Sequence, residues 1–215
     1  MATDILPDNE IIHRVIGGEK DLYALIVRRY NQRLYRVAMS IVNDDAEAED
    51  IMQVAYIKAF ENLAKFAFRS VFSTWLTRIL INESLLRLKK RKHSLHVNGD
   101  IMDNEVYRQH KTESPTPLTR MLNQELKIIL EEAIRNLPEK YRTVFVMREM
   151  ENMNLAETKE CLGISEVNVK VRLNRAKALL RDSLKEFYKN EDIFRFHLSR
   201  CDRVTNYVME RIKNL

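Results

Sequence analysis

Glycine and proline are scarce in this chain, with four of each among 215 residues. Sheets joined by many tight turns need more of these turn-forming residues, so the composition disfavours all-β sandwiches and barrels. The glycines match neither a phosphate-binding loop nor a dinucleotide-binding fingerprint. The sequence also contains no Gly-x-Ser-x-Gly elbow and no His-Glu-x-x-His pair. Nothing here favours an enzyme, and we predict no catalytic residue and no cofactor.

Cysteine is equally rare, since Cys161 and Cys201 are the only two. By themselves they cannot form a closed four-ligand zinc site, and they do not suggest a disulfide framework. No apolar run approaches the roughly 18 residues of a membrane-spanning helix. The start, Met1-Ala2-Thr3-Asp4, lacks the basic and apolar segments of a secretory signal. We therefore expect a cytoplasmic protein without membrane insertion and without a resident metal.

Apolar residues recur at helical spacing over most of the chain. Before residue 92 they predict three packed helices, preceded by a short helix that ends at Gly17-Gly18. The third stripe is expected to include Leu86, with Leu88 beyond its end. The members of the three stripes are Leu22, Leu25, Ile26, Leu34, Val37, Ala38 and Ile41; Ala48, Ile51, Met52, Ala55, Ala59 and Leu63; and Phe72, Leu76, Ile79, Leu80 and Leu86.

Residues 93–119 carry no sustained stripe and are rich in Ser, Asn, Asp and Pro, which predicts a flexible linker. A further stripe follows at Leu122, Leu126, Ile129, Leu130, Ala133 and Leu137. The expected fold is all-α, with two small helical domains, at residues 8–92 and 120–188, that can lie apart. We expect residues 189–215 to form a C-terminal helical extension.

The second domain contains a candidate helix-turn-helix. Asn154 and Glu157 have the spacing of a capping box, Gly163 supplies a turn, and Ser165 caps the next helix. That helix buries Val169, Leu173, Ala176, Leu180 and Leu184. Its outward face carries side chains that can bind phosphates and base edges: Asn168, Lys170, Val171, Arg172, Asn174, Arg175 and Lys177. A solvated basic face is the alternative.

The first domain has three patterns suited to binding. Asp44, Asp45, Glu47, Glu49 and Asp50 begin one helix, and these acids exceed what capping needs, which makes a basic protein partner plausible. A basic run at residues 87–92 ends another helix and is dense enough for phosphates. Between them, the aromatic segment 66–75 suits stacking on unpaired bases. For Phe72 and Trp75 we favour the alternative, a place in the core.

Several of these segments resemble the extracytoplasmic-function (ECF) sigma factors of bacterial RNA polymerase, in the sigma-70 family. Residues 47–53, 72–76 with Arg78-Ile79, and the basic run look like sigma region 2. Residues 137–142 and 169–177 look like sigma region 4. The resemblance spans residues 8 to 188, in the right order. It implies a promoter-specificity subunit that binds core RNA polymerase, recognises the −10 and −35 promoter elements and melts the promoter.

The resemblance also implies roles for residues. Polymerase binding would use Asp45, Glu47, Glu49, Asp50 and Gln53. The −10 element, as a single strand, would meet Lys65, Phe66, Phe68, Arg69, Ser70, Arg87, Lys89, Lys90 and Arg91. The −35 duplex would be read by Ser165, Asn168, Lys170, Val171, Arg172, Asn174, Arg175 and Lys177. An anti-sigma factor is a further expected partner.

The sequence departs from the family pattern at Val54, at Val167-Asn168 and at Val171, where Glu, Gly-Thr and Ser are common. These departures affect the promoter sequence read rather than the fold. In the C-terminal extension, His197 and Cys201 resemble part of a zinc motif, but Val204 replaces the next cysteine. A helix that docks on region 4 or on a partner is the preferred interpretation there. The competing function is a helix-turn-helix regulator that binds an operator without joining polymerase.

Overall fold

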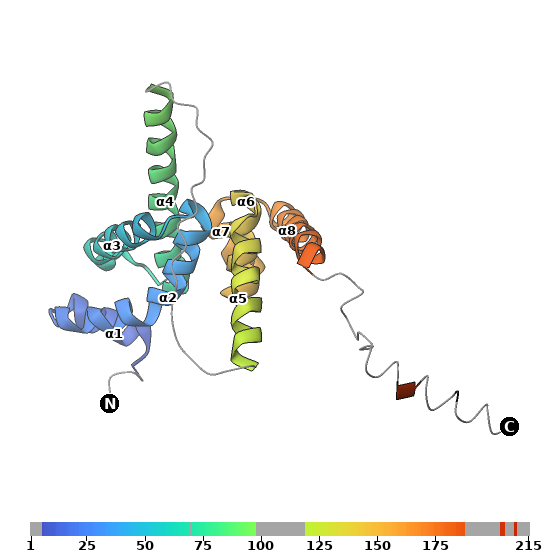
Figure 1. Ribbon diagram of the computed structural model, residues 1–215. Helices are drawn as coiled ribbons and strands as arrows, with labels where there is room; N and C mark the ends of the chain where they lie inside the picture. The colour runs from blue at the N-terminus through green and yellow to red at the C-terminus, as the bar shows by residue number, and fades with distance from the viewer. Residues whose placement is uncertain (1–5, 69, 98–118, 188–202, 205–208, 210–215) are drawn as a thin grey trace.

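The computed structural model describes residues 6–68, 70–97, 119–187, 203–204 and 209. Every regular element in these ranges is a helix or a helical turn, as the expected all-α class requires. The first unit contains α1 (Asp8–Ile16), α2 (Tyr23–Val42), α3 (Asp45–Glu61) and α4 (Phe72–Val97), with 3₁₀ turns at Lys20–Leu22 and Leu63–Lys65. The second unit contains α5 (Thr119–Arg135), α6 (Glu139–Phe145), a π turn (Val146–Met150), α7 (Leu155–Leu162) and α8 (Glu166–Phe187) (Figure 1).

Local chemistry explains where these helices begin and end. Asp44 caps α3, its carboxylate accepting the Glu47 backbone N–H at 2.8 Å, and Asn43 ends α2 in the left-handed conformation at φ 54°. The predicted capping box of α7 is confirmed, with both Asn154–Glu157 bonds present. Gly163 at φ 63° makes the turn into α8, where any other residue would be strained. Ser165 accepts the Asn168 N–H at 3.3 Å.

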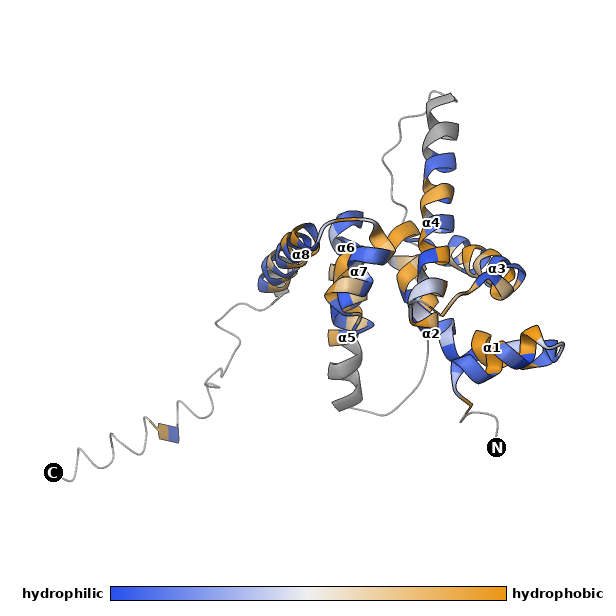
Figure 2. Ribbon diagram, turned by 180° about the vertical axis from the view of Figure 1, so that it is seen from behind, coloured by the Kyte–Doolittle hydropathy of each residue, from blue (hydrophilic) through white to orange (hydrophobic). Residues whose placement is uncertain are grey.

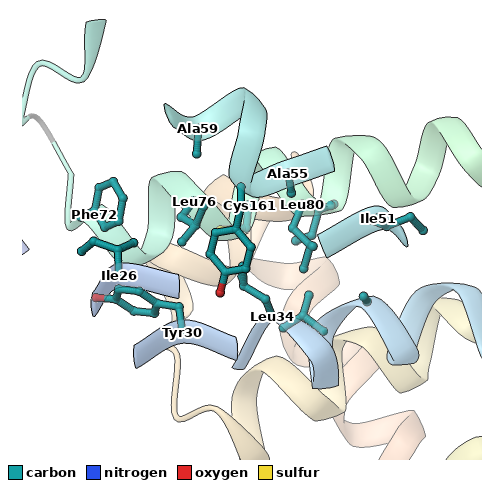
Figure 3. Close-up of a cluster of buried hydrophobic side chains, with 14 of the residues drawn as sticks. Ile26, Tyr30, Leu34, Ile51, Ala55, Ala59, Phe72, Leu76, Leu80 and Cys161 are labelled. Atoms are coloured by element: carbon teal, nitrogen blue, oxygen red, sulfur yellow. The ribbon is translucent and has the colours of Figure 1, made fainter. Parts of the chain in front are cut away.

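The first unit has one continuous core between α1, α2, α3 and α4. Figure 3 shows part of it, including Ile26, Leu34, Phe72 and Leu80. The predicted stripe on α4 was wrong at its end, because Leu86 is 48% exposed and Leu88 is 7% exposed. The buried face passes through Ile81 and Ser84 to Leu88, and Leu86 points away from it.

The second unit has a much smaller core of its own. Ala133 of α5 and Leu137, just beyond the end of that helix, pack on Ala176 and Leu180 of α8. The predicted stripe on α5 was wrong at Leu126 and Leu130, which are 43% and 40% exposed. The reason is that the core shared with α8 involves only the C-terminal part of α5.

The two units pack against each other rather than lying apart, which the sequence did not lead us to expect. Met147, Met153 and Cys161 of the second unit belong to the core of the first. Figure 3 draws Cys161 together with Leu76 and Leu80, and its thiol donates to the Thr74 carbonyl at 3.4 Å. Figure 2 shows hydrophobic segments where α2, α4 and α7 come together.

Hydrogen bonds and ion pairs reinforce this packing at the C-terminal end of α2. The Arg142 guanidinium is 5% exposed and donates to the Ser40 carbonyl at 2.7 Å. Thr143 donates to the same carbonyl at 3.2 Å. Carbonyls in the last turn of a helix lack intrahelical partners, so this end of α2 is satisfied by the second unit. Two ion pairs also join the units: Arg36–Glu151, at 3.0 Å, and Arg78–Glu160 between α4 and α7, at 3.8 Å.

The helical backbone of α4 continues to Val97, past residue 92 where we expected the first domain to end, and α5 begins at Thr119. The intervening residues 98–118, and most of the C-terminal extension with His197 and Cys201, lie outside the described residues. Among the helices that the structure does describe, none combines the length and hydrophobicity needed to cross a membrane.

Candidate functional site

A groove between α2 and α3 contains part of the acidic cluster. Its cavity of about 440 Å³ is lined by Val27, Asn31, Gln32, Tyr35, Asp45, Glu49, Met52, Gln53 and Tyr56. Three of the five residues predicted to bind polymerase, Asp45, Glu49 and Gln53, therefore lie in one concave surface. Sequence reasoning missed the α2 side of the groove. The pattern that could have indicated this wall is a set of polar residues at helical spacing on α2: Asn31, Gln32 and Tyr35.

Tyr35 joins the two walls of this groove. Its hydroxyl donates to the Asp45 carboxylate at 2.5 Å. Burial and this hydrogen bond raise the pKa of Tyr35 to about 12, so the phenol remains a donor even in mildly alkaline solution. Asp45 is thereby held in place with its negative charge at the rim, where it can meet a cationic partner.

Glu47 and Asp50 face a different way. Both are ion-paired with α4, Glu47 with Arg87 at 3.5 Å and with Arg91 at 3.8 Å, and Asp50 with Arg87 at 3.8 Å. The Glu47 side chain is only 22% exposed, whereas that of Asp50 is 66% exposed. The acidic start of α3 and the basic end of α4 thus form one network, although the sequence assigned them to different partners.

The basic end of α4 remains accessible beyond this network. Arg87, Lys89, Lys90 and Arg91 are all exposed, and Lys89 and Lys90 carry positive charge on the outward part of the helix. Figure 1 shows α4 projecting from the body of the first unit. A phosphate backbone can therefore approach this end of α4.

The aromatic segment is divided between core and surface. Phe66 is 6% exposed and Phe72 2%, and both rings pack on Trp75, at 5.1 Å and 5.6 Å between centroids. Phe68 is 40% exposed and adopts a left-handed backbone with φ 54°. Lys65 is exposed and Ser70 half-buried, while Arg69 lies outside the described residues. The expected core role of Phe72 is confirmed, and Phe68 is the ring of this loop that reaches the surface.

The outward side of α8 contains the residues expected there. All eight predicted contact residues are exposed except Arg172, which is half-buried. Val169 and Ala176 face inward with 0% exposure. Lys177 is paired with Glu149 of the π turn at 2.9 Å. The rest of this face is open to a duplex.

Comparisons with known proteins agree with this geometry. Residues 26–94 match the family described as Sigma-70 region 2, and residues 127–180 match Sigma-70, region 4. The ECF RNA polymerase sigma factor SigW of Bacillus subtilis is 33% identical over 178 residues, which cover 81% of this chain and 95% of that protein. This chain belongs to the ECF sigma factors. The ECF RNA polymerase sigma-E factor of Haemophilus influenzae is 28% identical over 182 residues, covering 83% of this chain and 96% of its own length.

Solved structures share the fold of this sigma factor. The sigma factor RpoE, in complex with the anti-sigma factor NepR from Bartonella quintana, matches with a TM-score of 0.62 at 20% identity, covering 76% of this chain and 96% of its own. CnrH, in complex with the cytosolic domain of CnrY, matches with a TM-score of 0.57 at 21% identity, covering 83% and 97%. The expected two-region helical fold is confirmed.

Proposed function

We propose that this sigma factor binds core RNA polymerase and directs promoter-specific initiation, with no catalysis of its own. The observation that carries the proposal is the alignment with SigW over 95% of its length, together with matches to regions 2 and 4 in order. The matched segments support the two proposed domains, 8–92 and 120–188, joined by residues 93–119 and followed by the extension 189–215. Because polymerase acts in the cytoplasm, we place the protein there.

The polymerase contact is assigned to the groove between α2 and α3. Asp45, Glu49 and Gln53 line it together with apolar side chains, and a mixed groove of this kind suits a helical partner that carries basic residues. Glu47 and Asp50 act at its edge, where their pairs with Arg87 and Arg91 also hold α3 against α4.

The −10 contact is assigned to the exposed part of the aromatic loop and to α4. Phe68 offers a ring to an unpaired base, and Lys65 and Ser70 lie beside it in sequence. Arg69 belongs to the same loop. Phe66 supports Phe68 from within the core, with ring centroids at 4.8 Å, rather than contacting DNA itself. Arg87, Lys89, Lys90 and Arg91 hold the phosphates.

The −35 contact is assigned to the outward face of α8. Its exposed residues near the start of the helix, from Ser165 to Arg175, can enter a major groove. Val171, which is 51% exposed, suits a thymine methyl group. Lys177 must leave Glu149 before it can bind a phosphate.

We infer that the packed arrangement of the two units is the state without polymerase. Promoter elements read by α8 and by the aromatic loop lie on separate parts of the DNA, so polymerase must hold the units apart. An anti-sigma factor that favours the packed arrangement is the expected inhibitor. The structural neighbour RpoE, a sigma factor in complex with the anti-sigma factor NepR, supports this partner class.

The test is run-off transcription from a promoter library, using purified core polymerase and the full chain. Glu49→Lys, in the groove, is expected to reduce core binding at least tenfold. The matched control Glu61→Lys reverses an exposed charge at the other end of α3 and should leave binding unchanged. No transcript from any promoter, or equal core binding by both variants, would count against the proposal. Tight duplex binding by the free chain would favour an operator-binding regulator instead.

A second part of the test addresses recognition of the −35 element. Asn174→Ala and Arg175→Ala should change the bases selected in the −35 element. A bidentate contact discriminates between bases at one position, and its loss relaxes the preference there. Arg181→Ala, further along α8, should lower transcription without changing the selected sequence. Identical selected sequences for all three variants would contradict the assignment of α8.

A further inference from the structure

Helix α1 places a histidine on the one exposed ring of the aromatic loop. The His13 imidazole and the Phe68 ring are stacked, with centroids 5.0 Å apart and planes inclined by 17°. Phe66 meets Phe68 at a tilt of 55° and connects the pair to Trp75 in the core. His13 of α1, two rings of the loop between α3 and α4, and Trp75 of α4 therefore form one continuous aromatic stack that ends at the surface.

The position of His13 is fixed by the packing of its helix. Ile11 and Ile12, at 0% exposure, and Val15, at 5%, bury the opposite side of α1. At the start of the helix, the Asp8 carboxylate accepts hydrogen bonds from Arg29 and from the Tyr30 hydroxyl of α2. Helix α1 is thus a rigid support, and it lies outside the segment 26–94 that matches region 2.

The exposed side of the stack is the imidazole. His13 is exposed, and its ring covers a face of Phe68. An unpaired base can reach that face only by displacing His13, or else it stacks on the imidazole. The left-handed backbone of Phe68 at φ 54° costs free energy, and such strain is concentrated at binding sites.

We propose that His13 is a DNA-contacting residue of the −10 site, on whose imidazole a flipped base stacks, with Phe68 beneath it as support. This inference rests on the proposed function and extends it to a helix outside the matched region. Aromatic stacking tolerates every base, so His13 contributes to capture of the single strand rather than to the choice of sequence.

The experiment uses the full chain assembled with core polymerase and a forked DNA taken from the run-off selection. 2-Aminopurine, whose fluorescence falls when it stacks, is placed at successive unpaired positions. His13→Ala should weaken fork binding about tenfold, the size expected when one base–aromatic stack is lost, and should relieve quenching at a single position. His13→Phe keeps a ring and should retain both properties.

Two controls separate stacking from a structural effect. Ile16→Ala removes another exposed side chain, 48% exposed, from the same helix and should leave fork binding unchanged. The emission of Trp75, the only tryptophan, should be the same in the free chain with and without His13→Ala, because the core rings remain in place.

The outcomes distinguish this inference from the proposed function. Equal fork binding and quenching by wild type and His13→Ala would overturn the inference alone. Tighter binding by His13→Ala would also overturn it, because the ring would then be an obstruction. Failure of the wild-type assembly to bind any fork would contradict the proposed function together with the inference.

Discussion

The first unit buries its apolar residues among its own helices, whereas the second unit buries several of its own against the first. Leu34, Leu76 and Leu80 have 0% exposure within α2 and α4. In contrast, Met147 and Met153 of the second unit are buried in the cluster of the first, and the separate core of the second contains four buried residues among those that the structure describes. A unit with so small a core depends on its neighbour. Separation of the two units therefore exposes apolar surface of the second unit.

The largest expected effect is in the core of the first unit. Leu34→Ala should lower the free energy of unfolding by about 4 kcal/mol, because a fully enclosed site cannot collapse around the cavity. Leu180→Ala, in the small core of the second unit, should cost about 2 kcal/mol, since a 6% exposed site at a thin interface can relax. Urea unfolding followed by circular dichroism measures both. Equal losses would contradict the contrast between the two cores.

The next effect is at the buried guanidinium between the units. Arg142→Met should cost about 3 kcal/mol, because the Ser40 and Leu137 carbonyls, at 2.7 Å and 3.1 Å, lose a charged donor. Cys161 is buried between the units, so its alkylation reports their separation. In a Cys201→Ser background, this alkylation should become much faster in the Arg142→Met variant. Arg181→Met, on the exposed side of α8, is the control and should alkylate at the wild-type rate.

Alkaline pH should also separate the units, by about 1.4 kcal/mol at pH 10, which is a smaller effect than the loss of Arg142. Burial raises the pKa of the Cys161 thiol from its ordinary value of 9.0 to about 12. The packed state therefore keeps its full stability below pH 9 and loses about 1.4 kcal/mol for each pH unit as the pH rises from 9 toward 12. Light scattering or distance labels on the two units can follow the opening. Cys161→Ala should abolish this component, and an unchanged pH profile in that variant would exclude the thiol as its cause.

The smallest effects are at the rim of the interface. Arg78→Ala should cost no more than about 0.5 kcal/mol, because its pair with Glu160 spans 3.8 Å and both side chains are about half exposed. Arg36→Ala should cost about 1 kcal/mol, since Glu151 is only 9% exposed at 3.0 Å. The same alkylation assay ranks the two variants. A larger effect for Arg78→Ala would mean that charge, rather than burial, holds the units together.

Local patterns in the sequence predicted most of the helices and their caps. The Asn154–Glu157 box, the turn at Gly163 and the inward face of α8 depend on neighbours within a few residues. The box and the turn were confirmed, as was the burial of Val169, Ala176 and Leu180, whereas Leu173 and Leu184 are half-buried. The exposed positions of Leu126 and Leu130 could not be foreseen. Periodicity identifies an apolar face, but it does not say whether another helix is long enough to cover it.

Contacts between distant segments could not be predicted from the sequence either. The bond from Arg142 to Ser40 joins residues 102 positions apart, and nothing near either residue indicates the other. The pairs of Glu47 with Arg87 and Arg91 likewise depend on how α3 packs on α4. The residue types at the candidate interfaces could be predicted. Which of them lie in the core and which at the surface, as for Phe66 and Phe68, depends on the packing of the helices and could not.

The burial of Met147, Met153 and Cys161 on the first unit has a thermal consequence. Separation of the units hydrates this apolar surface and so has a positive heat-capacity change. The free energy of separation is therefore a curved function of temperature. Cooling weakens the hydrophobic part of the contact, and sulfate salts strengthen it by exclusion from the newly exposed surface. The proportion of chains open to polymerase therefore depends on temperature and on salt type, even when no partner is present.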